Sequence, residues 1–230
     1  PDGTLVGWGL ACGIFNTARC AAEATLRVSA DGATRVVTGG HEMGQGIRSV
    51  IANAILQHLD VDPDKLQIVL GDTTAGPQPL TAGQWGTASV APVVEKAARQ
   101  LRAEFDELVA GRQFFGNMHA QLARLQQPYL EVSAAEVSPG QDPSALETLR
   151  RGGLAIAGPE FPRGTAMSYI AHFVEVHVEP RTRRVRMPRS VSIVDIGRVI
   201  SPKTAISQMS GGTVWGFSTA LREETEIDPR

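Results

Sequence analysis

The feature that most constrains the fold is Gly39–Gly46, with four glycines in eight residues. Glycine allows tight turns and close approach of the backbone N–H groups to a ligand. At the start of a helix these N–H groups also meet the positive end of the helix dipole. The segment is consistent with two structures, a loop that holds an anionic or polar cofactor and a helix-opening loop without a ligand.

Regular patterns flank this loop on both sides. Residues 23–29 and 34–38 alternate apolar and polar positions around Asp31-Gly32, which predicts a β-hairpin. After the loop, apolar residues recur every three or four positions and predict an amphipathic helix: Ile47, Val50, Ile51, Ala54, Ile55 and Leu59.

A second loop precedes a second predicted helix. Residues 65–70 read as a strand, and the polar stretch Gly71–Gly86 is long enough to suggest a functional loop. The following helix has an apolar stripe from Val90 to Leu108, with Thr87 or Ser89 as the expected N-cap.

The second half of the chain repeats this order of elements. Residues 172–178 and 185–194 predict another hairpin, and a helix from Pro202 follows, interrupted at Gly211-Gly212. We therefore expect an α+β fold with mixed sheets, packed helices and duplicated ββα-type units. The expected lobes are residues 1–110 and 161–230, joined by an irregular linker or insertion over residues 111–160, with a short strand at 130–132.

Composition excludes several classes of function. The formal net charge is −2 and only 5% of residues are aromatic, so neither a nucleic-acid surface nor a base-stacking platform is expected. Cys12 and Cys20 are expected as buried or half-buried free thiols. The five histidines lack metal-ligand spacing, so we expect no metal held by side chains.

The remaining candidates are polar residues in or near the glycine-containing loops, namely Gln45, Gln84, Thr87 and Gln208. Amides and backbone N–H groups suit a large, partly anionic ligand that accepts several hydrogen bonds. The alternative for Gln45 is a residue at the start of a helix that faces water, and the alternative for Gln208 is an exposed helix residue.

These residues belong to a set of motifs that resembles a known family. Gly39–Gly46 looks like the GGxEMGQG signature of the molybdenum-binding large subunit of the xanthine dehydrogenase/aldehyde oxidase family. The opening residues 11–15 with Arg19 resemble the bacterial aldehyde- and isoquinoline-oxidising branches. Further motifs follow in the family order and cover most of the chain: residues 71–73, 86–90, 171–176, 194–202, 208–212 and 215–216.

The resemblance implies a role for each matching residue. Gln45 would position the molybdenum centre, and the N–H groups of Gly44 and Gly46 would help to cradle the pterin. Gln84, Gly86 and Thr87 would belong to the loop that holds the pterin and phosphates, and Gln208 would touch the cofactor. Ile14 and Phe15 would lie near the substrate funnel. The metal would be held by the dithiolene of the cofactor.

The implied activity is hydroxylation of aldehydes or N-heterocycles with water-derived oxygen, using molybdopterin in its cytosine dinucleotide form. The family's catalytic base is a glutamate in a G-x-G-E motif, but the chain contains no Gly-Glu dipeptide. We therefore expect a chain truncated at both ends and inactive alone. The alternative is a non-catalytic subunit that only scaffolds a partner chain.

The same resemblance implies several partners besides a small-molecule substrate. These are the remainder of the large subunit, an iron–sulfur subunit that carries all the clusters, and a flavin subunit. The expected location is the cytoplasm, with the periplasm as the alternative.

Overall fold

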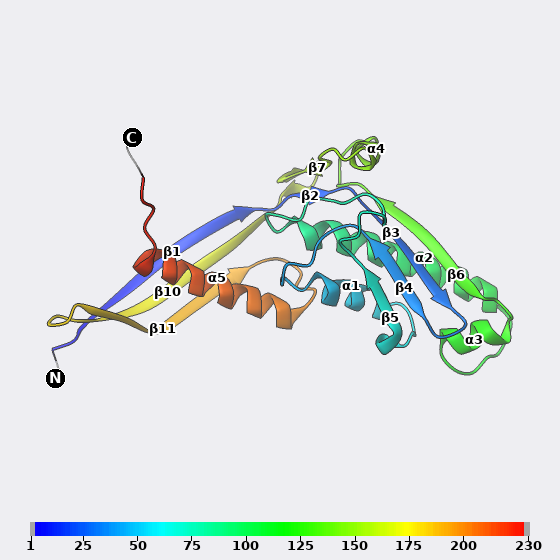
Figure 1. Cartoon of the computed structure of the whole chain (residues 1–230), viewed down its shortest axis with the longest axis horizontal. Coiled ribbons are helices and arrows are strands. Elements are labelled where there is room, and N and C mark those ends of the chain that lie inside the picture. The colour runs from blue at the N-terminus through cyan, green and yellow to red at the C-terminus, as the bar shows by residue number, and fades with distance from the viewer. Residues whose placement is uncertain (1–2, 228–230) are drawn as a thin grey trace.

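The structure is a computed structural model that describes residues 3–227. Figure 1 shows an elongated molecule with two parts, a layered body and a long arm. The body is built on a four-stranded sheet in the order β5-β4-β3-β6, and the arm on a three-stranded sheet in the order β1-β10-β11. Both contain helices packed beside sheets, which confirms the predicted α+β class.

The body contains the first predicted hairpin. β3 (Ala22–Ser29) pairs antiparallel with β4 (Thr34–Thr38) and with β6 (Tyr129–Glu136), and β4 pairs parallel with β5 (Leu66–Val69). Alternate residues of β3 are buried, as expected for a strand with one face on the core.

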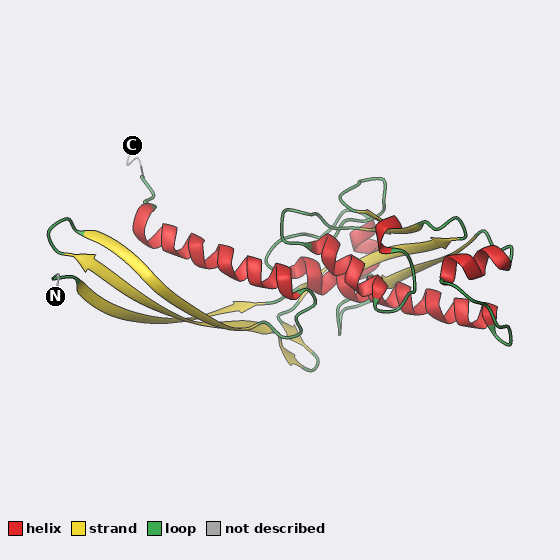
Figure 2. Cartoon of the chain, turned by 90° about the horizontal axis from the view of Figure 1, so that it is seen from below, coloured by secondary structure: helices red, strands yellow, loops and turns green. Residues whose placement is uncertain are grey.

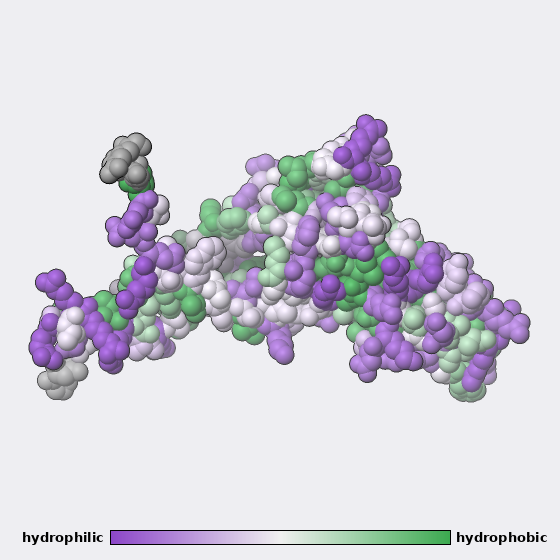
Figure 3. Space-filling model, viewed as in Figure 1, coloured by the Kyte–Doolittle hydropathy of each residue, from purple (hydrophilic) through white to green (hydrophobic). Residues whose placement is uncertain are grey.

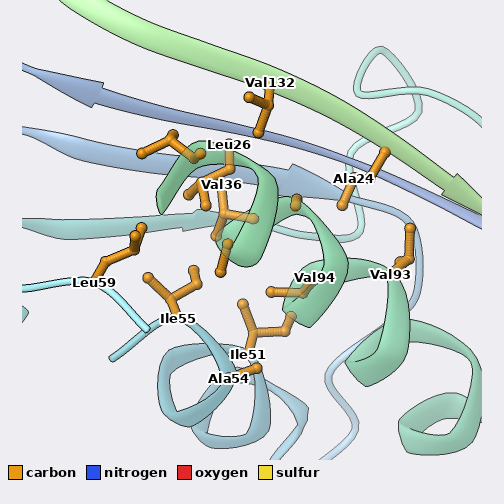
Figure 4. Packing of buried hydrophobic residues seen from close by; sticks show 14 of the residues in the cluster. Ala24, Leu26, Val36, Ile51, Ala54, Ile55, Leu59, Val93, Val94 and Val132 are labelled. Atoms are coloured by element: carbon orange, nitrogen blue, oxygen red, sulfur yellow. The ribbon is translucent and has the colours of Figure 1, made fainter. Parts of the chain in front are cut away.

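Two helices cover the buried face of this sheet. They are α1 (Ile47–Leu56) and α2 (Trp85–Val109). Figure 4 shows Leu26 of β3, Ile51 of α1 and Val94 of α2 pointing into one apolar core, and all three are fully buried. The predicted apolar spacing is therefore confirmed from Ile47 to Ile55 and along α2, whereas Leu59 is buried just beyond the end of α1.

The arm is formed by segments far apart in the sequence. β1 (Leu5–Asn16) pairs antiparallel with β10 (Met167–Glu179) along its whole length, and β10 pairs with β11 (Arg184–Asp195). The second predicted hairpin is therefore present. The helix α5 (Pro202–Arg222) lies along one face of this sheet (Figure 2) and has no buried residue.

The remaining elements are short. The 3-10 helix η1 (Pro63–Lys65) and α3 (Met118–Arg124) belong to the body. The two segments that join the body to the arm contain β2 (Arg19–Cys20), α4 (Ala145–Arg150), β7 (Ile156–Ala157), β8 (Glu160–Phe161) and β9 (Gly164–Thr165). The division of the chain at residues 110 and 160 stays a prediction, and strand pairing crosses both boundaries because β3 pairs with β6 and β1 with β10.

Four local expectations were wrong. The strand expected at 130–132 is the eight-residue β6, because pairing with β3 extends it. The N-cap of α2 is Gln84, not Thr87 or Ser89, because the helix begins at Trp85. α5 continues through Gly211-Gly212, since glycine lowers helix propensity without breaking the hydrogen-bond ladder. Cys12 is exposed on β1, whereas Cys20 is buried as expected.

The body core predicts a strong response to truncation. Leu26→Ala should lower the free energy of unfolding by about 3 kcal/mol, because a fully buried leucine leaves a cavity. Leu56→Ala on α1 is the control, since Leu56 is 37% exposed and should cost less than about 1 kcal/mol. Urea unfolding of both variants checks this, and equal losses would contradict the core assignment.

Candidate functional site

The segment Gly39–Gly46, here called the glycine loop, needs its glycines for conformation and for space. Gly40, Gly44 and Gly46 have φ angles of 109°, 98° and 85°, in the region that favours glycine. A Cβ added at Gly46 would lie 2.5 Å from Cγ2 of Thr204 on α5. The loop therefore lies directly against the start of α5, from the other half of the chain.

Glu42 occupies the centre of the glycine loop. Its carboxylate accepts hydrogen bonds from the backbone N–H groups of Gly44 at 2.9 Å, Gly46 at 3.0 Å and Arg48 at 3.2 Å. Partial desolvation raises the pKa of Glu42, but the three N–H donors and the Arg48 guanidinium outweigh it, so the pKa lies below its usual value. The N-terminus of α1 thus binds an anion supplied by its own loop.

The side chain of Gln45 is also engaged within the loop. Its Nε2 donates to the carbonyl of His41 at 2.6 Å, and its Oε1 accepts from the N–H of Met43 at 2.7 Å. The amide therefore fixes the backbone on both sides of Glu42. The sequence prediction placed Gln45 and the N–H groups of Gly44 and Gly46 on the cofactor, and in this structure the same groups hold the loop together.

The second loop, residues 71–84, packs against the glycine loop. The N–H of Gly40 donates to Oε1 of Gln78 at 2.9 Å, and the N–H of His41 donates to Oγ1 of Thr81 at 3.1 Å. Gly39 approaches Pro77 and Pro79 so closely that a Cβ there would clash. Two loops that the sequence placed about 40 residues apart therefore form one structure.

Gln84 connects the second loop to the arm. It has a φ of 61°, and its Nε2 donates to Oγ1 of Thr17 at 3.0 Å and to Oγ of Ser168 at 2.9 Å. Oγ of Ser168 in turn donates to the carbonyl of Phe15 at 3.4 Å. The structure thus brings Gln84 near Phe15, at the end of β1.

The N-terminus of α2 differs from that of α1. Within residues 3–227 no side chain caps α2, and its first turn contains Gly86 and Thr87, both partly exposed. The first N–H groups of a helix have no partner within the helix and carry the positive end of its dipole. These two residues therefore present donors that suit phosphate or another anionic group.

The other predicted site residues lie on the arm. The side chain of Gln208 is exposed and makes no hydrogen bond within the described part of the chain, and it follows Thr204 by one helical turn. It lines an apolar groove of about 520 Å³ between α5 and the arm sheet. Ile14 and Phe15 are 66% and 54% exposed near the end of β1.

The glycine loop, the second loop and the arm meet at one junction, and several residues that build it were not identified from the sequence. Glu42 had a recognisable signal, because an acid just before a helix is stabilised by the helix dipole. Gln78, Thr81, Ser168 and Thr204 had none, since their partners come from distant segments.

Within residues 3–227, no group of three or more His, Cys, Asp or Glu side chains is placed to hold a metal ion. Burial raises the pKa of the Cys20 thiol, with smaller opposing hydrogen bonds from Leu80 and Ser89. None of the helices in the described residues has the length and apolar character needed to cross a membrane.

The groups at this junction fit a large polar cofactor. The uncapped start of α2 and the free amide of Gln208 supply donors that have no partner among the residues that the structure describes. The glycine loop shows that its N–H groups bind an oxyanion, because the Glu42 carboxylate is held there. Cofactor contacts by Gly44 and Gly46 would require Glu42 to give up those hydrogen bonds.

The lowered pKa of Glu42 predicts an acid-sensitive loop. The carboxylate stabilises the fold above the ordinary glutamate pKa, and this contribution is lost as the pH falls through the lower pKa of the folded state. Glu42→Gln should lower the free energy of unfolding at pH 7 by at most about 1 kcal/mol, since the site is solvent-accessible. Urea unfolding from pH 7 to pH 3 measures this. An undiminished pH dependence in the variant would exclude Glu42 as the source.

Substitutions at Gly44 and Gly46 form a matched pair that tests the contact of the glycine loop with α5. Both have positive φ, but nothing lies within 4 Å of a Cβ added at Gly44. Gly44→Ala should cost about 1 kcal/mol of folding free energy from the backbone alone. Gly46→Ala should cost at least about 1 kcal/mol more, because Thr204 must shift. Thermal unfolding compares the two, and equal costs would contradict the close packing of the glycine loop on α5.

Comparison with known proteins places this geometry in a family. The family model described as "Molybdopterin cofactor-binding domain" matches residues 2–230. The chain is 29% identical over 228 residues to the aldehyde oxidoreductase molybdenum-binding subunit PaoC of Escherichia coli, covering 98% of this chain and 30% of that protein. It is also 29% identical over 246 residues to 6-hydroxypseudooxynicotine dehydrogenase complex subunit gamma of Paenarthrobacter nicotinovorans, covering 97% and 29%.

Solved structures show the same fold at lower identity. The Cu,Mo-CO dehydrogenase aligns with a TM-score of 0.75 and 18% identity, over 98% of this chain and 30% of that one. The aldehyde oxidoreductase from Desulfovibrio desulfuricans aligns with a TM-score of 0.68 and 21% identity, over 99% and 24%. The chain spans less than a third of the length of these proteins. On the match of residues 2–230, the chain belongs to the molybdopterin cofactor-binding domain family.

Proposed function

We propose that this chain is the cofactor-binding portion of a molybdenum hydroxylase that acts on aldehydes or N-heterocycles. The observation that carries the proposal is the junction of the glycine loop, the second loop and the start of α5, in a chain of the molybdopterin-binding family. The name of the relative PaoC, an aldehyde oxidoreductase subunit, supports aldehydes as the substrate class. When bound, the molybdenum cofactor would supply the two-electron oxidation of the substrate.

Some residues of the chain would donate hydrogen bonds to that cofactor, and others would hold the surrounding loops in place. Gly86 and Thr87 would donate from the uncapped start of α2 to the pterin or its phosphates, and Gln208 would donate from α5. Gln84 would keep its bonds to Thr17 and Ser168 and so hold the second loop against the arm. Ile14 and Phe15 would form an apolar part of the substrate approach.

Gln45 would position the molybdenum centre through the glycine loop. Its amide now fixes His41 and Met43, so its first contribution would be to hold the loop in a form that accepts the cofactor. Gly44 and Gly46 would contact the pterin where Glu42 releases them.

The proposed assembly extends beyond this chain. The names of the relatives, a "molybdenum-binding subunit" and a "complex subunit gamma", support partner subunits here. We propose an iron–sulfur subunit, a flavin subunit and the remainder of the large subunit, which would supply the catalytic base. The cofactor would be the cytosine dinucleotide form. A cytoplasmic location stays a prediction.

The test uses the full-length large subunit in its purified complex. Gln45→Ala should lower molybdenum and pterin content, or aldehyde turnover, by about 10- to 100-fold, the effect typical of residues that orient a metal centre. Gln113→Ala is the control, because Gln113 is exposed and remote in sequence from both loops. Metal analysis, pterin fluorescence and dye reduction measure these quantities. Unchanged values in Gln45→Ala would remove Gln45 from the site, and a wild-type complex without molybdenum and pterin would overturn the proposed function.

A further inference from the structure

Gln84 has a backbone conformation that glycine usually occupies. Its φ of 61° and ψ of 21° lie in the left-handed region, where the Cβ of any other residue is crowded by the backbone. Strain of this kind persists only where other contacts hold the residue, and it is concentrated at functional sites. The contacts of Gln84 come from its side chain, which reaches from the start of α2 to the arm.

The amide of Gln84 is fixed by acceptors at the end of the arm sheet. Its Nε2 donates to the carbonyl of Asn16 at 3.3 Å, to Oγ1 of Thr17 at 3.0 Å and to Oγ of Ser168 at 2.9 Å. The carbonyl of Asn16 only accepts, so the nitrogen of the amide and not its oxygen points to this cluster. Oγ of Ser168 donates onward to the carbonyl of Phe15 at 3.4 Å, so it accepts from Gln84.

The register of the arm sheet places Phe15 on the same face as Ser168. The two residues lie directly opposite one another on β1 and β10, and opposite residues of an antiparallel pair share a face. Two residues further along β10, Ile170 lies on the same face and lines the groove under α5. Phe15 therefore points to the side of the arm that carries α5, whose start meets the glycine loop.

Ile14 lies on the opposite face, here called the outer face, together with Cys12 and Tyr169. The family resemblance predicts both Ile14 and Phe15 near the substrate, and both are exposed, at 66% and 54%. β1 ends where the arm meets the body (Figure 1), and Figure 3 shows hydrophobic patches on the surface there. Since successive side chains of a strand point to opposite faces, Phe15 is the one of the two that shares a side with the glycine loop.

We propose that Gln84 positions the ring of Phe15 beside the bound cofactor, and that this ring contacts an aromatic aldehyde substrate. The backbone of Gln84 begins α2, next to the proposed cofactor donors Gly86 and Thr87, while its side chain holds the end of β1. One residue thus links the proposed cofactor site to the proposed substrate contact. Gln84 acts through Phe15 and is a positioning residue, not a cofactor ligand.

The chemistry of Phe15 selects the kind of aldehyde. A phenyl ring packs against another aromatic ring in stacked or edge-to-face geometry, which adds to the gain from apolar burial. An aldehyde with an aromatic ring would use this contact, whereas acetaldehyde has no ring to place there. The inference rests on the proposed function above, and it gives Gln84 a different role from the cofactor contact that the family resemblance implies.

The test measures steady-state kinetics of the full-length large subunit in its purified complex. Gln84→Ala should raise the KM for benzaldehyde about 10-fold, the effect that loss of one or two hydrogen bonds has on binding. The kcat for benzaldehyde and the KM for acetaldehyde should change less than about threefold, since the cofactor stays in place. Gln100→Ala on the same helix is the control, because Gln100 is exposed and its side chain has no hydrogen bond within the described chain.

A double-mutant cycle tests whether Gln84 acts through Phe15. Phe15→Ala should raise the KM for benzaldehyde at least as much as Gln84→Ala does, because it removes the contact itself. The variant Gln84→Ala/Phe15→Ala should raise the KM no further than Phe15→Ala alone, since coupled residues are not additive. Additive increases would overturn the proposal, and so would a wild-type KM in Gln84→Ala or in Phe15→Ala.

Gln84→Gly separates the role of the side chain from the stability of the fold. Glycine adopts the left-handed conformation without strain, so Gln84→Gly should melt at least as high as Gln84→Ala. Both variants lack the amide and should raise the KM for benzaldehyde equally. A wild-type KM in Gln84→Gly would show that misfolding of the alanine variant caused its change, and would overturn the proposal.

Molybdenum and pterin content of the same samples distinguishes the two roles of Gln84. Wild-type content in Gln84→Ala, with a raised KM, would support the positioning role. Loss of cofactor from Gln84→Ala would assign Gln84 to the cofactor and overturn the positioning role, while the proposed function would stand. Absence of cofactor from the wild-type complex would overturn the proposed function, and the positioning role with it.

Discussion

The pairing of β1 with β10 is the interaction on which the rest of the structure depends. It joins Leu5–Asn16 to residues 178–167 one by one, across about 160 positions of sequence. β1 leads through β2 into the body sheet, and β10 leads through β11 into α5. Because this ladder fixes the arm relative to the body, α5 starts against the glycine loop, where Thr204 meets Gly46. Both halves of the candidate site are thus set by one long-range sheet contact.

The glycine loop illustrates how an anion-binding element is kept ordered by its own residues. The N–H groups at the start of α1 would lose hydrogen bonds if they were left unpaired. Glu42 accepts two of them, from Gly46 and Arg48, and a third hydrogen bond from Gly44 in the loop. Gln45 fixes the loop backbone on either side. The start of α2, which lacks such a cap, retains free donors. The N–H groups at the start of α1 are therefore used within the fold, whereas those at the start of α2 are the ones that we propose for the cofactor.

Much of the fold could be predicted from local patterns. The two hairpins and the helices after them follow from alternation, from spacing of three and four, and from turn residues such as Asp31-Gly32. Errors occurred where tertiary contacts extend or shift an element. β6 is eight residues long because it pairs with β3 along its whole length. α2 begins at Trp85, earlier than predicted, directly after Gln84, whose side chain is hydrogen-bonded to Thr17 and Ser168. The exposure of Cys12 was missed because the outer face of β1 has no covering layer within residues 3–227.

The sequence by itself determined the class of elements, their order and the family, because hydrophobic period, turn chemistry and glycine spacing are local properties. Only the tertiary structure decided which groups are free to act. Gln45 and the N–H groups of Gly44 and Gly46 are occupied by contacts within the loop, while Gln208 and the first turn of α2 are not. It also decided that Phe15, Ser168 and the amide of Gln84 lie on the same side of the arm. Register and hydrogen-bond competition depend on segments that meet only after folding.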